Sequence, residues 1–169
     1  MKIKKLAIAV AVAGTLASGA ALAATQSVTA NIDFDTALAL TKNQDIEFGI
    51  VKAAQSGTYT ISTAGVVTPT SGGEVIGGTP QAADITIEGS ATQTIDITAD
   101  NYAAENGVTP SAATCSYDGG AEAACTTFSN QAAPDTGTTL LVGVQVVADG
   151  TQTASETATP TFDIVVTYN

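Results

Sequence analysis

Hydrophobic and polar positions alternate with a period of two near both ends of the chain. Close to the start, the apolar positions of this pattern are Val28, Ala30, Ile32 and Phe34. At the end of the chain they are Phe162, Ile164, Val166 and Tyr168. This period is typical of a strand with one buried face. The sequence therefore predicts amphipathic strands at 28–34 and 162–168, and it leaves open whether each finds its partner within the same molecule.

Most of the intervening chain has the same character. Alternation predicts further strands at 45–51, 57–63, 83–89, 93–100 and 138–150. We expect 83–89 and 93–100 to form the two arms of a hairpin that turns at Ser90–Thr92. The stretch "DTALALTKNQ" (35–44) has room for one helical turn at most, and no amphipathic helix is expected elsewhere in the mature chain.

Turn residues separate these short runs, and Thr, Val and Ile dominate within them. Many short strands with frequent turns in one chain favour two packed sheets over a helical or mixed fold. The predicted fold class is therefore all-β, an immunoglobulin-like Greek-key β-sandwich.

Residues 101–138 differ from the rest, because they are rich in Ala, Ser, Thr, Asn and Gly and poor in large apolar side chains. We expect this segment to be a long excursion on the sandwich. It holds both cysteines, Cys115 and Cys125, with the turn sequence "YDGG" between them. An even number of cysteines in an exported chain predicts a disulfide, here stapling a short hairpin. The spacing does not match a redox or zinc motif.

The first 23 residues resemble a secretory signal peptide. Lys2, Lys4 and Lys5 precede an apolar run of small residues that ends in "ALA" at 21–23. We expect cleavage after Ala23, which leaves 24–169 as a single domain. The run is too short and too rich in alanine for a membrane anchor, and no later run is long enough to span a bilayer.

Cleavage also changes the charge. The mature chain keeps two positive charges, Lys42 and Lys52, against 16 acidic side chains, for a net charge of −14. Such a protein repels nucleic acid and anionic membranes. The chain has no His, so the usual acyl-transfer triads and common zinc sites lack their central group.

No arrangement of the remaining residues points to catalysis. Asp33 and Asp35, and Asp84 and Glu88, invite a loose calcium site, but no calcium-binding loop sequence is present and alternation places these carboxylates on solvent-facing sides of strands. A carboxylate pair for glycoside hydrolysis does not stand out, and the two lysines lie in polar contexts. We expect a protein that is not an enzyme and needs no cofactor or metal.

The order of segments resembles the bacterial exported-protein family called domain of unknown function 4402. The likeness depends on Phe48–Gly49, on the apolar-x-apolar-x-Gly pattern at Ile85–Gly89, and on the terminal Tyr168–Asn169. It covers most of 40–169. The chain departs from the family pattern at 156–160, "ETATP", where Gly-x-Tyr-x-Gly is usual. The resemblance implies a secreted β-sandwich without known catalysis.

A looser similarity is to pilus subunits of the chaperone–usher route, which end in an alternating strand with a penultimate Tyr, as at Tyr168. In those subunits a strand donated by a neighbour completes the sandwich. The resemblance implies that 28–34 is a donor strand and that a periplasmic chaperone is a partner. The usual Gly about fourteen residues from the end is absent here. The other interpretation is that 28–34 is the first strand of its own sandwich.

The sequence thus predicts a secreted or cell-surface structural subunit, fimbria-like, that associates with itself or with other surface subunits by strand addition. It would reach the cell surface, a fimbrium or the medium through the periplasm. The alternative is an adhesin-type module that recognises a glycan or a surface ligand through the Cys115–Cys125 region, since loops on rigid sandwiches often bind ligands.

Overall fold

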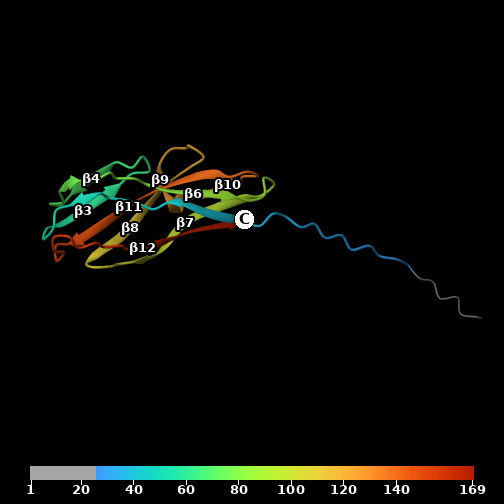
Figure 1. Ribbon diagram of the computed structural model, residues 1–169. Coiled ribbons are helices and arrows are strands. Elements are labelled where there is room, and N and C mark those ends of the chain that lie inside the picture. Colours follow the sequence, from blue (N-terminus) through green and yellow to red (C-terminus); the bar gives the residue numbers. More distant parts are fainter. Residues whose placement is uncertain (1–25) are drawn as a thin grey trace, which may run out of the picture. The chain divides into compact units, whose positions relative to one another are not determined.

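The structure, a computed structural model, describes residues 26–169 (Figure 1). The predicted signal peptide at 1–23 lies outside these residues. Two units are distinguished, Met1–Asp33 and Phe34–Asn169. In the first, residues 26–33 carry no helix or strand.

The second unit is all-β apart from one turn of 3-10 helix, η1 (Cys125–Thr127). Its strands are β1 (Ala39–Gln44), β2 (Ile50–Val51), β3 (Ser56–Ile61), β4 (Val67–Thr70), β5 (Val75–Gly77), β6 (Ala83–Glu88), β7 (Thr94–Ala103), β8 (Val108–Tyr117), β9 (Ala123–Ala124), β10 (Phe128–Ala132), β11 (Thr138–Asp149) and β12 (Thr161–Tyr168). Every pairing between them is antiparallel.

The larger sheet is organised around β11. One flank of β11 pairs first with β6 and then with β3, while the other flank pairs with β8 along most of its length. Strand β1 extends the sheet beyond β6, and β4 extends it beyond β3. Gly143 lies where β11 passes from β6 to β3, and a side chain there would collide with the carbonyl oxygen of Ile61.

The second sheet has three strands in the order β10–β7–β12, and β2 and β5 form a separate two-stranded ribbon. The two main sheets enclose one core. Side chains at alternate positions of β11 are at most 6% exposed, and they pack with Ile95 and Ile97 of β7, which are fully buried. The predicted all-β sandwich is therefore confirmed.

Two local predictions were wrong, and a third segment took a form that the sequence had left open. Strands β6 and β7 do not form a hairpin, because β6 belongs to the large sheet and β7 to the small one, so the turn at Ser90–Gln93 connects the two layers. In 45–51, only Ile50–Val51 is a strand, with one isolated bridge at Glu47. The segment 39–44, within the stretch thought able to form a helical turn, is strand β1.

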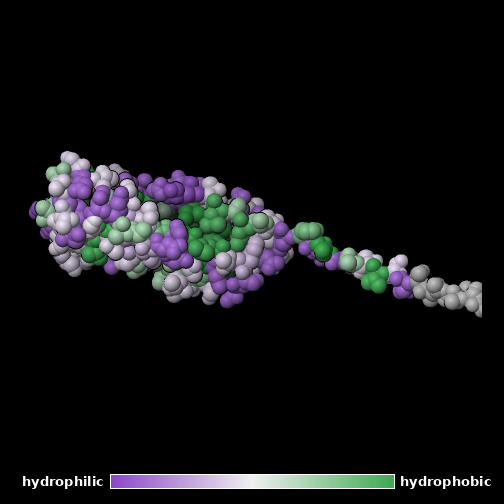
Figure 2. Space-filling model, turned by 90° about the horizontal axis from the view of Figure 1, so that it is seen from below, coloured by the Kyte–Doolittle hydropathy of each residue, from purple (hydrophilic) through white to green (hydrophobic). Residues whose placement is uncertain are grey.

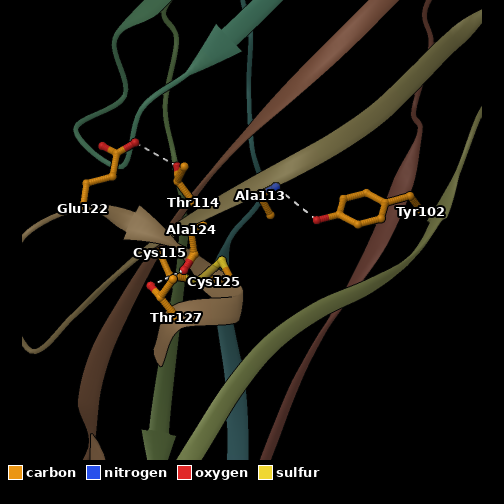
Figure 3. Close-up of a disulfide and its surroundings, with 8 residues drawn as sticks. All are labelled: Tyr102, Ala113, Thr114, Cys115, Glu122, Ala124, Cys125 and Thr127. Atoms are coloured by element: carbon orange, nitrogen blue, oxygen red, sulfur yellow. Dashed lines mark hydrogen bonds between the residues drawn. A yellow bond between two sulfur atoms is a disulfide. The ribbon is translucent and has the colours of Figure 1, made fainter. Parts of the chain in front are cut away.

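Residues 101–138 are also not an excursion, because they supply β8, β9 and β10 to the two sheets. The predicted disulfide is confirmed: Cys115 of β8 and Cys125 of η1 are joined, and both are almost fully buried. Figure 3 shows the bond where the β8–β9 hairpin meets η1. The core beside β8 is filled although most inward residues of β8 are small, because the disulfide and Tyr117 occupy the space there.

Replacing both cysteines, Cys115→Ala with Cys125→Ala, should lower the free energy of unfolding by about 2–3 kcal/mol, because the unfolded chain is no longer constrained by the crosslink. Urea denaturation followed by circular dichroism measures the change. As a control, the unmodified chain in a reductant should show a similar loss. Equal stability of the variant and the oxidised protein would contradict the structural role of the bond.

Candidate functional site

An open groove lies between β12 on one side and β1, β6 and β11 on the other. Its cavity volume is about 1330 Å³. The strand residues that line it are largely apolar: Leu40, Ala83, Ile85, Val142, Val144, Val146, Ala148, Phe162 and Ile164. Figure 2 views the body from below, on the side where β12 lies in Figure 1, and a patch of hydrophobic residues is open on that face.

The groove exposes part of the core. In β12, the core-facing residues Phe162, Ile164 and Val166 are only half-buried, whereas the equivalent positions of β11 are buried. On the opposite wall, Leu40 of β1 is 42% exposed although its partner in register, Ile87, is fully buried. The core is thus covered at its centre and uncovered along β1 and β12.

Both strands that border the groove have a free edge. Within residues 26–169, β12 pairs only with β7, and β1 pairs only with β6. The amide of Asn169 donates to the carbonyl of Thr94 at the end of this ladder (3.0 Å). Because backbone amides alternate in direction along a strand, the N–H groups of Ile164, Val166 and Tyr168 point to the free edge. The edge of β12 therefore presents unpaired backbone groups next to exposed core side chains.

The hydroxyl of Tyr168 joins the end of β12 to the start of β1. It accepts a hydrogen bond from the Ser90 amide and donates one to the carbonyl oxygen of Thr36, each at 2.7 Å. Gly89 makes room for this contact, since a Cβ atom there would lie 2.6 Å from the Tyr168 hydroxyl and 3.0 Å from Leu38 Cδ2. We call Asp35, Thr36, Ser90, Gln93 and Tyr168 the root clasp.

Asp35 is the charged member of the root clasp. Its carboxylate accepts hydrogen bonds from the Gln93 amide (2.9 Å) and the Thr92 hydroxyl (3.1 Å), and from the Thr36 amide (2.8 Å). The pKa of Asp35 is lowered to about 2, first by the Ser90 hydroxyl and then by Gln93 and Thr36, which favour the charged form. The point at which 26–34 leaves the second unit is therefore fixed by several polar contacts.

Lys42 and Lys52 lie on the rim of the groove. Lys42 pairs with Asp45 (2.6 Å) and Lys52 with Glu74 (2.8 Å), and all four side chains are more than half exposed. Hydrogen bonding to Glu74 and its charge raise the pKa of Lys52. No group of three or more His, Cys, Asp or Glu side chains is placed to hold a metal ion in the described part of the chain.

The region proposed for an adhesin-type site uses its polar groups internally. The Glu122 carboxylate accepts from the hydroxyls of Thr114 (2.8 Å) and Thr63 (2.9 Å), so its pKa is lowered although partial burial raises it (Figure 3). Ser116 donates to the carbonyl of Gly120 (2.7 Å), which closes the turn. A small cavity of about 380 Å³ lies beside Tyr117.

The predicted strand residues at the two ends have different placements. The residues Phe162, Ile164, Val166 and Tyr168 lie in β12 with their side chains toward the core, as the alternation predicts. The residues of the candidate donor strand, Val28, Ala30, Ile32 and Phe34, carry no strand and are exposed, with 90% for Val28, 72% for Ile32 and 92% for Phe34. The sequence patterns did not predict strand β1 on the opposite wall of the groove, or the contacts of the root clasp.

Comparison with known protein families shows the family to which the chain belongs. A profile described as Domain of unknown function (DUF4402) matches residues 38–168. The chain belongs to the DUF4402 family. No curated protein and no solved structure matches it. The similarity to pilus subunits thus has no support from the comparisons, and a membrane-spanning helix is not found in the described residues.

The residues that carry the DUF4402 likeness lie partly in the wall of the groove and partly in or beside the root clasp. Phe48 lines the groove and packs against the core. Gly89 and Tyr168 touch one another in the root clasp. Asn169 fixes the end of β12 against β7, since its side-chain amide donates a hydrogen bond to the Asp96 carboxylate (2.9 Å). The pattern that the sequence shares with the family therefore describes how β12 and the start of β1 are held.

Gly89→Ala should destabilise the protein by about 1–3 kcal/mol, because the added methyl group pushes Tyr168 and Leu38 out of place. Urea denaturation reports the loss. Gly77→Ala is the matched control, since a Cβ there meets only Ile50 Cδ1 at 3.9 Å. Equal effects of the two substitutions would show that the approach of Tyr168 to Gly89 is not needed.

Carbon-13 NMR titration of the carboxyl groups should give a pKa of about 2 for Asp35. Gln93→Ala should move this pKa upward, while Gln145→Ala, in the half of β11 that pairs with β3, should not. Because the pKa is lowered on folding, the contribution of Asp35 to stability is present above its ordinary value of 3.8 and is lost as the pH falls through about 2. An ordinary pKa in the unmodified chain would argue against the root clasp.

Proposed function

We propose that this protein is a non-catalytic structural subunit that assembles by β-strand addition, with 28–34 of one chain completing the groove of another. The observation that carries the proposal is the groove itself, which joins an unpaired strand edge to an uncovered part of the core. Addition of a strand there satisfies backbone groups and buries apolar side chains in the same step.

The segment 28–34 has the form that such a site requires. Its four apolar residues stand at every second position, so all of them face one side of a strand. At about 3.3 Å per residue its seven residues span roughly 23 Å, close to the roughly 26 Å of the eight-residue β12. Its apolar side chains are largely exposed, which is costly for residues that have no partner to cover them.

The nature of the groove supports binding of a chain more than chemistry. Its strand walls are mainly apolar. Of the charged residues that border it, Lys42 and Lys52 form exposed ion pairs, and Glu47, Glu156 and Asp163 are exposed. Catalytic sites need reactive groups held in defined, partly desolvated positions. A long apolar groove with an open strand edge instead suits an extended peptide segment.

Export and a surface location are part of the proposal. The Cys115–Cys125 disulfide is compatible with an oxidising compartment, and the first 23 residues have the features of a signal peptide. An open groove of this kind is prone to non-specific aggregation before assembly. A periplasmic chaperone that covers the groove during export is therefore a further proposed partner, and a fimbrium-like polymer on the cell surface is the proposed product.

Ile32→Asp tests this function without touching the second unit. In the chain that begins at Ala24, we expect light scattering to show polymers for the unmodified protein and monomers for Ile32→Asp. Placing a carboxylate against apolar walls costs about 2 kcal/mol or more, so affinity should fall about 30-fold or more. Thr29→Asp, on the opposite side of the segment, is the matched control and should still assemble.

A second measurement separates loss of assembly from a solubility effect. A fluorescent peptide of residues 24–35 should bind the chain that lacks 24–34, and the same peptide with Ile32→Asp should not. A monomeric unmodified chain, or equal binding of both peptides, would contradict the proposal.

A further inference from the structure

We propose that the partner is a second copy of this chain, whose segment 28–34 adds to the free edge of β12, antiparallel to it, so that the subunits join head to tail. This inference rests on the proposed function and goes beyond it by naming the edge, the direction and the polarity of the assembly. Both the differences between the strand edges and the position of the root clasp support it.

The free edge of β12 lacks the protection that the other edges have. Edge strands in natural proteins are blunted by proline, by inward-pointing charges, or by bulges and short length. Strand β4 carries Pro69, and β10 is five residues long with an irregularity between Phe128 and Gln131. Strand β1 presents Lys42 to the groove, in register with Ile85.

Strand β12, by contrast, has eight residues with no proline. Its one charged residue, Asp163, borders the groove but alternates with the core-facing side chains and accepts a hydrogen bond from Asn101. The amides of Ile164, Val166 and Tyr168 point to its free edge, as the bond from Asn169 to Thr94 requires. A partner strand therefore finds a continuous row of donors and acceptors along β12, while Lys42 opposes the burial of an apolar strand against β1.

The root clasp sets the direction. It holds Thr36 against Tyr168, so the segment of each chain leaves at the C-terminal end of that chain's own β12. If an incoming segment runs antiparallel to β12, its residue 34 lies at the opposite end, near Thr161, and the donor's body follows there. Each subunit then donates its segment at one end and accepts a neighbour's segment at the other end, which produces an open head-to-tail filament.

The parallel direction does not produce such a filament. It would bring the donor's body to the Tyr168 end, where the acceptor's own segment leaves and the space is already in use. A segment that returns to its own groove would also run parallel to β12. It would need to reverse within residues 35–38, where Asp35 and Thr36 are engaged by Gln93 and Tyr168.

Two constraints restrict the register of the added strand on β12: the repulsion of like charges and the alternation of inward and outward side chains. Full overlap of 28–34 with 162–168 in the antiparallel direction would set Asp33 opposite Asp163, and like charges in cross-strand pairs repel. A shift by two residues keeps the apolar side inward and places Asp33 opposite Thr161. In this register Phe34 lies opposite Pro160, which borders the groove just before β12. Ile50 and Ile76, which also line the cavity, are 57% and 59% exposed.

Disulfide crosslinking between introduced cysteines tests in one experiment which strand edge is used, in which direction the segment runs, and whether the partner is a second copy. Each variant of the chain that begins at Ala24 carries one donor cysteine, Thr29→Cys or Asp33→Cys, and one acceptor cysteine on the outer side of β12, placed at Thr161, Asp163, Val165 or Thr167. A further acceptor, Thr41→Cys, reports addition to β1. The native disulfide stays in place because it is buried. Oxidised samples are separated on a non-reducing gel.

We expect a ladder of covalent multimers whose strongest acceptor moves from Val165→Cys to Thr161→Cys when the donor cysteine moves from 29 to 33. A ladder with the opposite order would mean parallel addition, and crosslinking through Thr41→Cys would mean addition to β1. Either result overturns this inference and leaves the proposed function intact. Crosslinked monomers would mean that the segment fills its own groove. A chain that is monomeric by light scattering and forms no crosslink would overturn both proposals.

Discussion

The small sheet is narrower than the large one that it covers. Strands β10, β7 and β12 shield the centre of the core, but they end before β6 and β1, and the apolar faces of these strands remain partly open. Burial of apolar surface is the main favourable term in folding, so an uncovered wall of Leu40, Ile85 and Ile164 is a deficit that another strand can remove. The groove, the free edges and the proposed assembly all derive from this difference in width.

The last strand has two roles that meet at Tyr168. Through β7 it closes the sandwich, and in the proposed assembly its free edge receives the partner's strand. The tyrosine hydroxyl connects the end of this strand to Ser90 and Thr36, so the acceptor surface and the point where the chain's own segment departs are held together. In the proposed assembly, the edge of β12 that accepts a strand and the segment 28–34 that is donated are therefore held in a fixed geometric relation.

Period-two alternation predicted the strands at 57–63, 83–89, 93–100, 138–150 and 162–168, because large apolar side chains mark the buried side of each. It did not show which sheet a strand joins, and so β6 and β7 were wrongly expected to pair. Strand β8 was missed since its inward positions are small residues such as Ala113 and Cys115, with the large Tyr117 only at its end. The root clasp depends on contacts between residues as distant as Thr36 and Tyr168, and local patterns do not contain that information.

The antiparallel ladder between β1 and β6 begins a few residues after the root clasp. A pull on the segment 28–34 is transmitted through Thr36 into β1 along the axis of that strand. The load is then shared by all the hydrogen bonds of the ladder in shear, and none is peeled away first. In the proposed assembly the donated strand beside β12 would be loaded in the same way, so a filament of these subunits would resist tension along its length far better than forces that separate its subunits sideways.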